Sequence, residues 1–479
     1  MSAGQVSELL KKREIKADEL LSGIYERIGA VEEKTGAYVS LCREKAEAAA
    51  AAAQKKIDAG DSGALCGIPM AIKDNICTNG VKTTCSSKML ENFVPPYDAA
   101  VCEKLGAAGA VMTGKLNMDE FAMGGSTETS YFKKTANPWN TERVPGGSSG
   151  GAAAAVAAGE AFFALGSDTG GSIRQPSSFC GVVGLKPTYG AVSRFGLIAF
   201  ASSLDQIGPI TRNVEDCAAV LNAVCGVDPR DSTCADHRHP DYTAALGGEI
   251  KGLKIGIPKE YLGEGLDPAV KEAVLRAARH FESLGAVCDE VSLPATDFAV
   301  PAYYLISSAE ASSNLARYDG IKYGFAAENC KNLAELMNRT RGEGFGREVK
   351  RRIMLGTYAL SAGYYDAYYK KALRVRRIIK NGFDRIFEKY DLIIGPAAPT
   401  TAYPLGSKSG DPLAMYLGDI YTVPVNIAGL PAMSLNCGFD GDGMPIGLQI
   451  IAPAFGESAI FRAAYAFEKS TPYNQFPNI

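Results

Sequence analysis

The sequence predicts an α/β fold in which helices cover both faces of a central mixed, largely parallel β-sheet. The order strand, helix, strand over residues 251–293 indicates a parallel pair joined by a crossover helix. Short apolar runs separated by Gly, Pro, Asn and Ser fill residues 65–226, which is typical of a sheet with long functional loops. Hydrophobic residues make up 46% of the chain and charged residues 22%, so its 479 residues have the composition of a globular protein with a large core.

The first 60 residues are expected to be helical. Residues 17–33 carry apolar side chains at helical spacing, and residues 46–56 are strong helix formers that end before Gly60. We expect residues 1–60 to form a helical layer that packs outside the main body and belongs to the same domain.

Residues 61–479 are expected to form an α/β domain with a helical elaboration at about 300–390. An alanine-rich helix is predicted at 151–159. The elements expected after the elaboration are strands at 391–396 and 446–451, a turn at 440–443 and a closing helix at 457–468. We find no internal repeat of fixed period, so a solenoid or propeller is excluded.

The net charge and the spacing of the cysteines exclude several classes of function. The net charge of −3 provides no general attraction to phosphate backbones, so any contact with nucleic acid should be local or made by a partner. The 12 cysteines form no C-x-x-C pair, which argues against zinc fingers and iron–sulfur clusters. The sequence shows neither a signal-peptide pattern nor an apolar run of about 18 residues, so we expect a cytoplasmic location with free thiols.

Three segments carry the strongest functional signal. Lys73 lies near the end of the segment Gly67–Asp74. Two Gly-Gly-Ser triplets come later in the chain, and their serines are Ser148 and Ser172. Glycines let backbone N–H groups approach a substrate closely, and a serine can attack if a lysine kept neutral by desolvation takes its proton. Apolar residues precede Lys73, which favours such desolvation. Taken singly, a flexible glycine–serine loop and a solvated lysine are the simpler interpretations.

Two other motifs have weaker claims. Residues 109–115 nearly match a phosphate-binding P-loop, but Leu116 stands where magnesium binding needs Ser or Thr, so a structural strand is the better interpretation. The pattern Gly146-x-Ser148-x-Gly150 formally matches a nucleophile elbow, which requires a preceding strand and a later histidine. Here a proline-containing loop precedes it.

The number and the positions of the histidines indicate which kind of base could activate a serine. The chain has three histidines, of which His237 and His239 lie in a polar connection and His280 lies on a helix with a surface pattern. A Ser-His-Asp triad is therefore not expected, and lysine becomes the preferred base. The same shortage argues against a zinc enzyme.

The segments that contain these residues resemble the marker segments of the amidase signature family. The matching stretches, in the order that the family shows, are residues 67–74, 145–151, 166–176 and 184–188. The resemblance implies a single amidase-signature domain with a Ser-Ser-Lys triad. Ser172 would be the nucleophile, Ser148 would follow a cis peptide bond and relay the proton, and Lys73 would be the terminal base. The implied oxyanion hole consists of the N–H groups of Thr169, Gly170, Gly171 and Ser172.

Further stretches resemble one branch of this family, the glutaminase subunits of tRNA-dependent amidotransferases. They are residues 308–320, 346–372 and 415–429. The resemblance implies that Arg352 holds the carboxylate of glutamine and Asp419 its amino group, with Tyr303 nearby. An α-amino acid needs one cation and one anion at a fixed separation, so this set is chemically reasonable. Arg351 and Tyr304 remain alternatives because each adjoins the residue chosen.

The branch implies a complete reaction. This chain would hydrolyse glutamine and supply ammonia for conversion of Glu-tRNA(Gln) to Gln-tRNA(Gln), with no cofactor or metal of its own. A partner B subunit would hold the tRNA and use ATP and magnesium, and a small C subunit would complete a heterotrimer. The sequence leaves open the preference for Glu-tRNA(Gln) or Asp-tRNA(Asn), the activity without partners and the path of ammonia.

Two alternatives remain at this stage. A free-standing amidase would act on another small amide, and the context of Arg352 and Asp419 argues against it. A scaffold protein without catalysis would retain only the fold, and the intact Lys73, Ser148 and Ser172 argue against that alternative.

Overall fold

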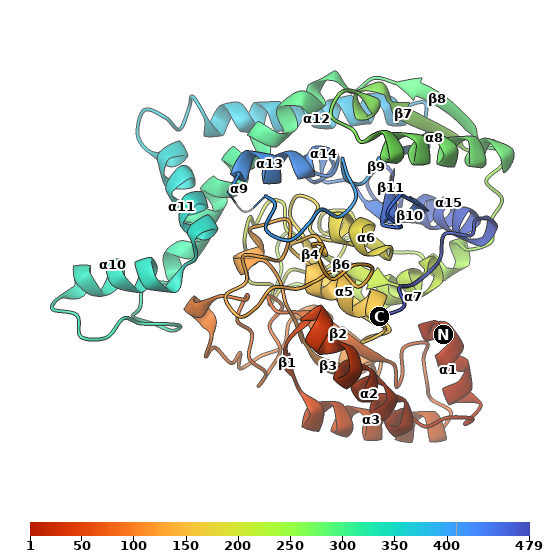
Figure 1. Cartoon of the computed structure of the whole chain (residues 1–479), viewed down its shortest axis with the longest axis horizontal. Helices are drawn as coiled ribbons and strands as arrows, with labels where there is room; N and C mark the ends of the chain where they lie inside the picture. The colour runs from red at the N-terminus through yellow and green to blue at the C-terminus, as the bar shows by residue number, and fades with distance from the viewer. Residues whose placement is uncertain (409) are drawn as a thin grey trace.

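An eleven-stranded β-sheet runs through the residues that the computed structural model describes, 1–408 and 410–479 (Figure 1). The strands lie in the order β1-β3-β2-β4-β6-β5-β10-β11-β9-β7-β8. Their bounds are β1 (Tyr38–Leu41), β2 (Pro69–Lys73), β3 (Val111–Leu116), β4 (Phe163–Asp168), β5 (Val183–Lys186), β6 (Gln206–Thr211), β7 (Lys254–Pro258), β8 (Val287–Val291), β9 (Leu392–Pro396), β10 (Ala432–Phe439) and β11 (Pro445–Ile451).

The sheet is mixed. Strands β3, β2 and β4 run parallel to one another, and so do β9, β7 and β8. The strands between these groups pair antiparallel, and β1 joins the edge antiparallel to β3. The α/β class and the mixed sheet are confirmed, and parallel pairing prevails within the two groups but not across the antiparallel centre. The short turn at 440–443 requires β10 and β11 to run antiparallel.

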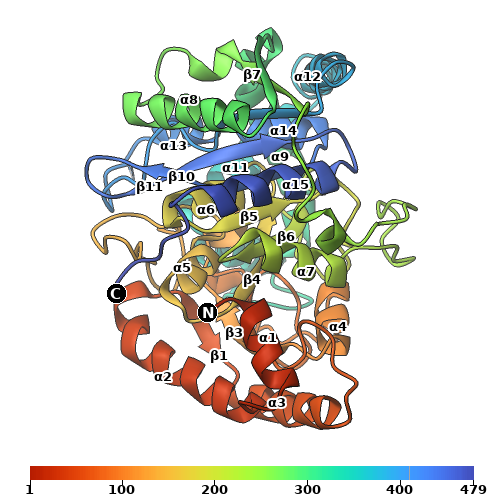
Figure 2. The ribbon, with the colours of Figure 1, turned by 90° about the vertical axis from the view of Figure 1, so that its right-hand side faces the viewer.

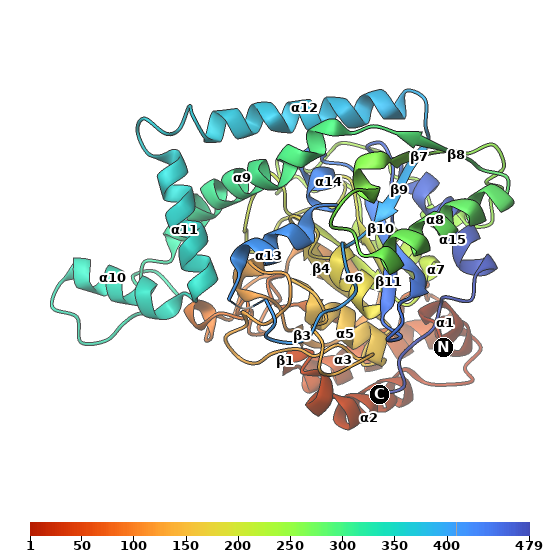
Figure 3. The ribbon, with the colours of Figure 1, turned by 45° about the horizontal axis from the view of Figure 1, so that its top comes forward.

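Helices cover both faces of this sheet. Figure 2 looks onto the side where α7 and α15 lie, and Figure 3 shows α10 and α11 at one end of the molecule with α12 running along its upper edge. The helices are α1 (Ala3–Lys11), α2 (Ala17–Thr35), α3 (Arg43–Asp58), α4 (Ala100–Ala107), α5 (Gly150–Ala158), α6 (Arg174–Cys180), α7 (Val214–Val224), α8 (Pro268–Ser283), α9 (Ala299–Asn314), α10 (Leu333–Gly344), α11 (Arg347–Leu360), α12 (Tyr369–Phe387), α13 (Pro412–Tyr416), α14 (Val423–Ala428) and α15 (Glu457–Ser470).

The predicted strand–helix–strand unit is present as β7, α8 and β8. Asp267 caps α8 by accepting a hydrogen bond from the N–H of Ala269, and Pro268 occupies the first helical position. The two strands pair in parallel register from Lys254 opposite Val287 onward. The crossover prediction is therefore confirmed.

Residues 1–60 contain α1, α2 and α3, as expected, but also the strand β1, which the sequence pattern did not reveal. Four residues are too few for a clear alternation, and Tyr38 is buried because its hydroxyl group reaches Thr113 Oγ1 of β3 at 3.0 Å. The helical prediction is thus wrong for residues 38–41. The grouping of 1–60 and 61–479 within one domain stays a prediction.

Helix α5 is buried on all sides and begins with two glycines for a steric reason. A Cβ atom on Gly151 would lie 2.4 Å from the carbonyl oxygen of Asn117, and one on Gly150 would lie 2.1 Å from Thr127 Oγ1. Only glycine lets the helix start this close to the neighbouring loops. The segment before α5 is therefore held against β2 and β4. Within the described residues, no helix combines the length and apolarity needed to cross a membrane.

Candidate active site

Lys73 is the last residue of β2 and is completely buried. Its Nζ atom lies 2.8 Å from Ser148 Oγ, 2.8 Å from Ser149 Oγ and 2.9 Å from Ser167 Oγ. It also donates a hydrogen bond of 3.2 Å to the carbonyl oxygen of Ser167. The end of β2, the segment before α5 and strand β4 therefore meet at one amino group.

Burial makes this lysine unusually acidic. Loss of solvation lowers the pKa of Lys73 to about 7, although the carboxylates of Asp119, Asp168 and Asp205 act in the opposite direction. A substantial fraction of the amine is neutral at neutral pH. It can then accept a proton from the hydroxyl group of Ser148, which is what the predicted base requires.

The backbone holds Ser148 on both sides. The Gly147–Ser148 peptide bond is cis. The N–H of Gly147 donates to Gln175 Oε1 at 2.9 Å, and the carbonyl oxygen of Ser148 accepts from the N–H of Asp119 at 3.3 Å. These bonds keep the Ser148 hydroxyl directed at Lys73.

Ser172 lies in the turn between β4 and α6. It is 8% exposed, whereas Lys73 and Ser148 are 0% exposed, so Ser172 is the member of the predicted triad nearest to solvent. Its carbonyl oxygen accepts a hydrogen bond of 3.1 Å from the N–H of Ser149. The structure thus joins the two Gly-Gly-Ser segments by a backbone contact beside Lys73.

A buried ion pair shapes the turn that carries Ser172. Asp168 accepts hydrogen bonds from the N–H groups of Gly171 at 2.8 Å and Ile173 at 3.1 Å, and from Arg174 Nε and Nη2 at 3.0 Å each. Burial alone would raise the pKa of Asp168, but Arg174 outweighs it and brings that pKa to about 2. Arg174 also donates to Thr422, Asn426 and Gln449.

The predicted oxyanion turn presents unequal donors. The N–H of Gly171 is engaged by Asp168 at 2.8 Å. The N–H groups of Thr169, Gly170 and Ser172 have no hydrogen-bond acceptor within residues 1–408 and 410–479. These three groups can receive developing negative charge, and Gly171 serves to shape the turn.

Tyr303 of α9 packs directly on this turn. A Cβ atom on Gly170 would come within 2.6 Å of Tyr303 Cζ, so the tip of the phenol ring touches the Gly170 backbone. Thr422 Oγ1 donates to the carbonyl oxygen of Gly170 at 2.7 Å from the other side. Tyr303 is buried and also packs edge-on against Tyr304, with ring centroids 5.0 Å apart.

Arg352 points inward from α11 and is 2% exposed. Its Nε atom donates to Glu348 Oε1 at 2.7 Å. Its guanidinium carbon lies 4.5 Å from the ring centroid of Tyr304, 5.0 Å from that of Tyr416 and 5.9 Å from that of Phe200. The cation is thus held against aromatic faces by one carboxylate.

Asp419 lies at the other end of Tyr304. The Tyr304 hydroxyl group donates to Asp419 Oδ2 at 3.2 Å. Burial raises the pKa of Asp419 to about 7, opposed by the Tyr304 hydrogen bond and by Arg352. Tyr304 therefore bridges a cation and an anion, the arrangement that an α-amino acid requires.

The adjacent arginines lie in different surroundings, and so do the adjacent tyrosines. Arg351 is 34% exposed, pairs with the second oxygen of Glu348 and lines a cavity of about 220 Å³ together with Glu120 and Lys408. Arg352 lies on the Tyr304 ring instead. Tyr303 contacts the backbone of Gly170, and Tyr304 donates to Asp419.

Sequence reasoning missed several residues of this site. Asp168 and Arg174 lie inside the third marker segment, so their opposite charges could have indicated a pair. Glu348 could have been paired with Arg352 from its i,i+4 spacing on α11. Asp205 and Tyr416 gave no such signal, because they contact residues of other elements. Asp205, for example, accepts a hydrogen bond from Thr169, and no local pattern connects these positions.

The rejected motifs have structural roles. His237 stacks on Phe455 with ring centroids 4.0 Å apart, and His280 Nε2 lies 2.7 Å from Ser470 Oγ. Residues 111–116 of the P-loop-like segment form β3. Among the described residues, no group of three or more His, Cys, Asp or Glu side chains is placed to hold a metal ion.

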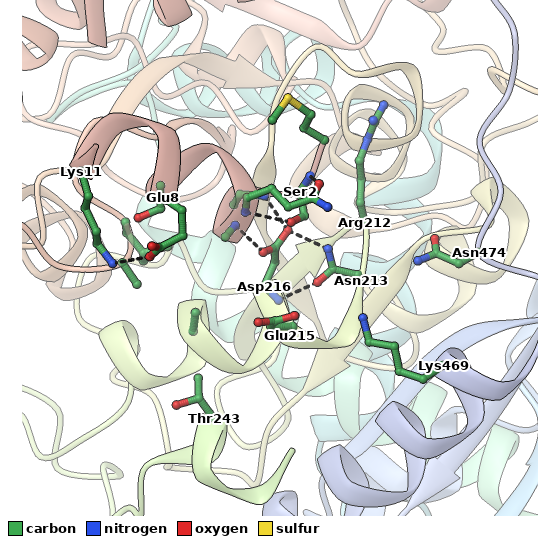
Figure 4. A pocket seen from close by; sticks show the side chains of 18 of the residues that line it. Ser2, Glu8, Lys11, Arg212, Asn213, Glu215, Asp216, Thr243, Lys469 and Asn474 are labelled. Carbon is green, nitrogen blue, oxygen red and sulfur yellow. Dashed lines mark hydrogen bonds and ion pairs between the residues drawn. The ribbon is translucent and has the colours of Figure 1, made fainter. Parts of the chain in front are cut away.

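A cavity of about 580 Å³ lies elsewhere, between α1, α7 and the C-terminal segment (Figure 4). At its centre Asp216 accepts hydrogen bonds from the N–H groups of Ala3 and Gly4 at 2.8 and 2.9 Å. None of the predicted site residues lines this cavity, and its central carboxylate anchors α1.

Comparisons with known proteins agree with this geometry. A family model described as Amidase matches residues 19–461. The A subunit of glutamyl-tRNA(Gln) amidotransferase from Moorella thermoacetica is 61% identical over 476 residues, which cover 99% of this chain and 97% of that relative. The crystal structure of the protein of the same name from Thermotoga maritima is 42% identical with a TM-score of 0.81, covering 98% of this chain and 96% of that one. Native peptide amidase from Stenotrophomonas maltophilia is 30% identical with a TM-score of 0.86, covering 100% and 98%.

Proposed function

Because this chain belongs to the amidase signature family, we propose that it is the glutamine-hydrolysing component of a tRNA-dependent amidotransferase. The names of the relatives from Moorella thermoacetica and Thermotoga maritima support this assignment. The observation that carries it is the pairing of Arg352 and Asp419 across Tyr304, beside a buried Lys73 and two serines. A general amide hydrolase does not need a separate cation and anion for its substrate.

Proton transfer begins at Lys73. The neutral amine accepts the proton of Ser148, and Ser148 in turn accepts the proton of Ser172 as the Ser172 oxygen attacks the side-chain amide carbon of glutamine. The hydrogen bond between Lys73 and Ser148, 2.8 Å long, is the first link of this relay. Two serines and a desolvated lysine thus perform the function that a histidine performs in other serine hydrolases.

The tetrahedral intermediate places its negative charge at the turn after β4. The N–H groups of Thr169, Gly170 and Ser172 would donate to this oxygen, while Asp168 keeps Gly171 in place. Of the four donors expected from the sequence, these three fit the role best because their N–H groups have no acceptor among the described residues.

Collapse of the intermediate releases ammonia. The proton held by Lys73 returns through Ser148 to the leaving nitrogen, and a γ-glutamyl ester remains on Ser172. Water then hydrolyses the ester to glutamate by the same relay in reverse order. The balance is one glutamine and one water to one glutamate and one ammonia.

The part of the site that contains the aromatic side chains around Arg352 would select the substrate. Arg352 would bind the α-carboxylate of glutamine and Asp419 its α-ammonium group, with Tyr303 between them and the reacting carbon. The substrate ammonium would also lower the pKa of Asp419, because an adjacent cation favours the carboxylate.

The remaining parts of the proposal concern other chains. Ammonia would pass to a B subunit that holds Glu-tRNA(Gln) and uses ATP and magnesium, and a C subunit would complete a cytoplasmic heterotrimer. The relatives from Moorella thermoacetica and Thermotoga maritima are both named as A subunits, which supports a multi-subunit enzyme.

The decisive experiment is reconstitution with B and C partners and measurement of glutamine-dependent Gln-tRNA(Gln) formation. Ser172→Ala should abolish it, and Ser177→Ala is the matched control because that buried hydroxyl of α6 has no partner among the described residues. Retention of glutamine-dependent activity by Ser172→Ala would refute the mechanism. Efficient hydrolysis of unrelated amides without transamidation would instead favour a free-standing amidase, in keeping with the similarity to peptide amidase.

A further inference from the structure

Asp205 is a buried carboxylate that the proposed chemistry does not use. It lies immediately before β6 and is 2% exposed. One oxygen, Oδ1, accepts a hydrogen bond of 2.6 Å from the hydroxyl group of Thr169. The other, Oδ2, accepts from the N–H groups of Phe200 at 2.9 Å and Ala201 at 3.0 Å.

These contacts reach both halves of the site. Thr169 is the residue directly before Gly170, whose N–H group faces the developing charge. Phe200 is packed near Arg352, with 5.9 Å between the guanidinium carbon and the ring centroid. A single carboxylate therefore connects the oxyanion turn with the aromatic wall of the substrate pocket.

The loop that carries Asp205 is itself held from the outside. Ser203 donates through its N–H group and its hydroxyl group to Glu310 of α9, at 2.9 and 2.6 Å. Arg376 of α12 donates to the hydroxyl and the carbonyl oxygen of Ser203 at 2.9 and 3.1 Å. Because the loop is anchored to α9 and α12, the position of Asp205 is fixed, and its hydrogen bond can in turn fix the position of Thr169.

We propose that Asp205 is a positioning residue for the oxyanion turn, acting through the hydroxyl group of Thr169. The proposal rests on the proposed glutaminase function. Asp205 does not touch the reacting atoms; it sets the place of Thr169 and hence the direction of the Gly170 N–H group. A misplaced donor weakens stabilisation of the transition state more than it weakens binding of glutamine.

The chemistry of the side chain suggests a sharp test. The N–H groups of Phe200 and Ala201 can only donate, so in Asp205→Asn the amide oxygen must serve them. The amide nitrogen then faces Thr169, which becomes the acceptor of a neutral hydrogen bond in place of a charge-assisted one. The loop should stay closed while the contact with Thr169 weakens.

Kinetics of glutamine hydrolysis should be measured in the reconstituted complex for Asp205→Asn, Thr169→Val and the double variant. We expect kcat to fall about tenfold in each single variant while KM changes less than about threefold, because the effect is on transition-state geometry. The double variant should lose no more than the worse single variant, since both act on one contact. Thr169→Ser keeps the hydroxyl group and should recover most of the kcat lost by Thr169→Val.

Asp216→Asn is the matched control. Asp216 is also 2% exposed, and it also accepts from two backbone N–H groups and one side chain, but at the anchor of α1. The variant Asp216→Asn should lower the melting temperature about as much as Asp205→Asn does, without changing kcat.

Five outcomes separate the possibilities. A kcat of Asp205→Asn within twofold of wild type, an additive double variant, or an equal loss of kcat in Asp216→Asn would each overturn the role of Asp205. If Asp205→Asn does not assemble, Thr169→Val decides alone, and an unchanged kcat there overturns the proposal. Ammonia-dependent transamidation reports on assembly in every variant. A wild-type complex without glutaminase activity would refute the proposed function itself.

Discussion

Burial is what makes Lys73 usable as a base. An exposed lysine has a pKa near 10.4 and is almost fully protonated at neutral pH. Here complete burial brings the pKa to about 7 although three carboxylates oppose the change. Three serine hydroxyl groups around Nζ satisfy the amine without supplying a counter-charge.

The pH dependence of glutamine hydrolysis should reflect this lysine. The protonated amine is inactive, so activity should rise with pH through about 7. For kcat/KM the acid limb should also contain Asp419, whose pKa is about 7 in the free site and whose carboxylate is needed to bind the substrate ammonium. For kcat the bound ammonium keeps Asp419 ionised, so one group should titrate.

The measurement is a pair of pH profiles between about 5.5 and 9 on the assembled complex. The expected result is that two groups titrate in the acid limb of the kcat/KM profile and one group titrates in the acid limb of the kcat profile. A kcat that stays constant from pH 8 down to pH 5.5 would contradict a role for neutral Lys73.

A second residue-scale prediction separates the adjacent arginines. Arg352→Gln removes the cation on Tyr304 and should raise KM for glutamine about thirtyfold or more, the cost of a lost charge-assisted hydrogen bond. Arg351→Gln changes a side chain that is about one-third exposed and lines a separate cavity, so KM should stay within about threefold. Steady-state kinetics with both variants provides the comparison. Equal effects would contradict the distinction between the two arginines, and a larger effect of Arg351→Gln would mean that their roles are reversed.

At the scale of elements, short glycine-rich turns place the reactive groups. Helix α5 and the β4–α6 turn approach each other because glycines precede or begin both helices. Regular elements with clear periodicity, such as α2, α8 and α15, followed the sequence predictions closely. The four-residue β1 did not, because its pairing with β3 depends on contacts rather than on its own pattern.

The packing of α5 makes a testable difference between two helical glycines. Gly151→Ala would place a Cβ atom 2.4 Å from a backbone oxygen and should lower the free energy of unfolding by at least about 1–3 kcal/mol. Gly23→Ala in the exposed face of α2 meets nothing within 4 Å and should raise it by about 0.5–1 kcal/mol. Denaturant unfolding of both variants measures the contrast, and equal signs would refute the steric account.

At the scale of the whole molecule, the sheet and the helices α9 and α11 contribute different parts of the proposed site. The sheet supplies Lys73 and the turn with Ser172, while α9 and α11 supply Tyr303 and Arg352. The proposed nucleophile and the proposed substrate ligands therefore come from different structural elements. The P-loop-like segment of this chain forms β3.

The proposed amination on another chain predicts ammonia rescue. Lys73→Ala should reduce glutamine-dependent transamidation by several orders of magnitude in the complex, because the relay has lost its base. Added ammonium salt should restore Gln-tRNA(Gln) formation to near the wild-type rate. The check is charging with glutamine or with ammonia in parallel, and a well-assembled variant that ammonia fails to rescue would refute the division of labour.

The sequence alone determined the α/β class, the position of several helices and strands, and the identity of Lys73, Ser148 and Ser172 as candidates. These conclusions depend on local periodicity, on marker segments of contiguous residues and on the scarcity of histidine. Only the tertiary structure decided that Gly171 is engaged by Asp168, that Arg352 rather than Arg351 lies on Tyr304, and that Asp205 reaches Thr169. The physical reason is that pKa, burial and hydrogen-bond geometry arise from residues far apart in sequence, which the sheet and the helices α9 and α11 bring together.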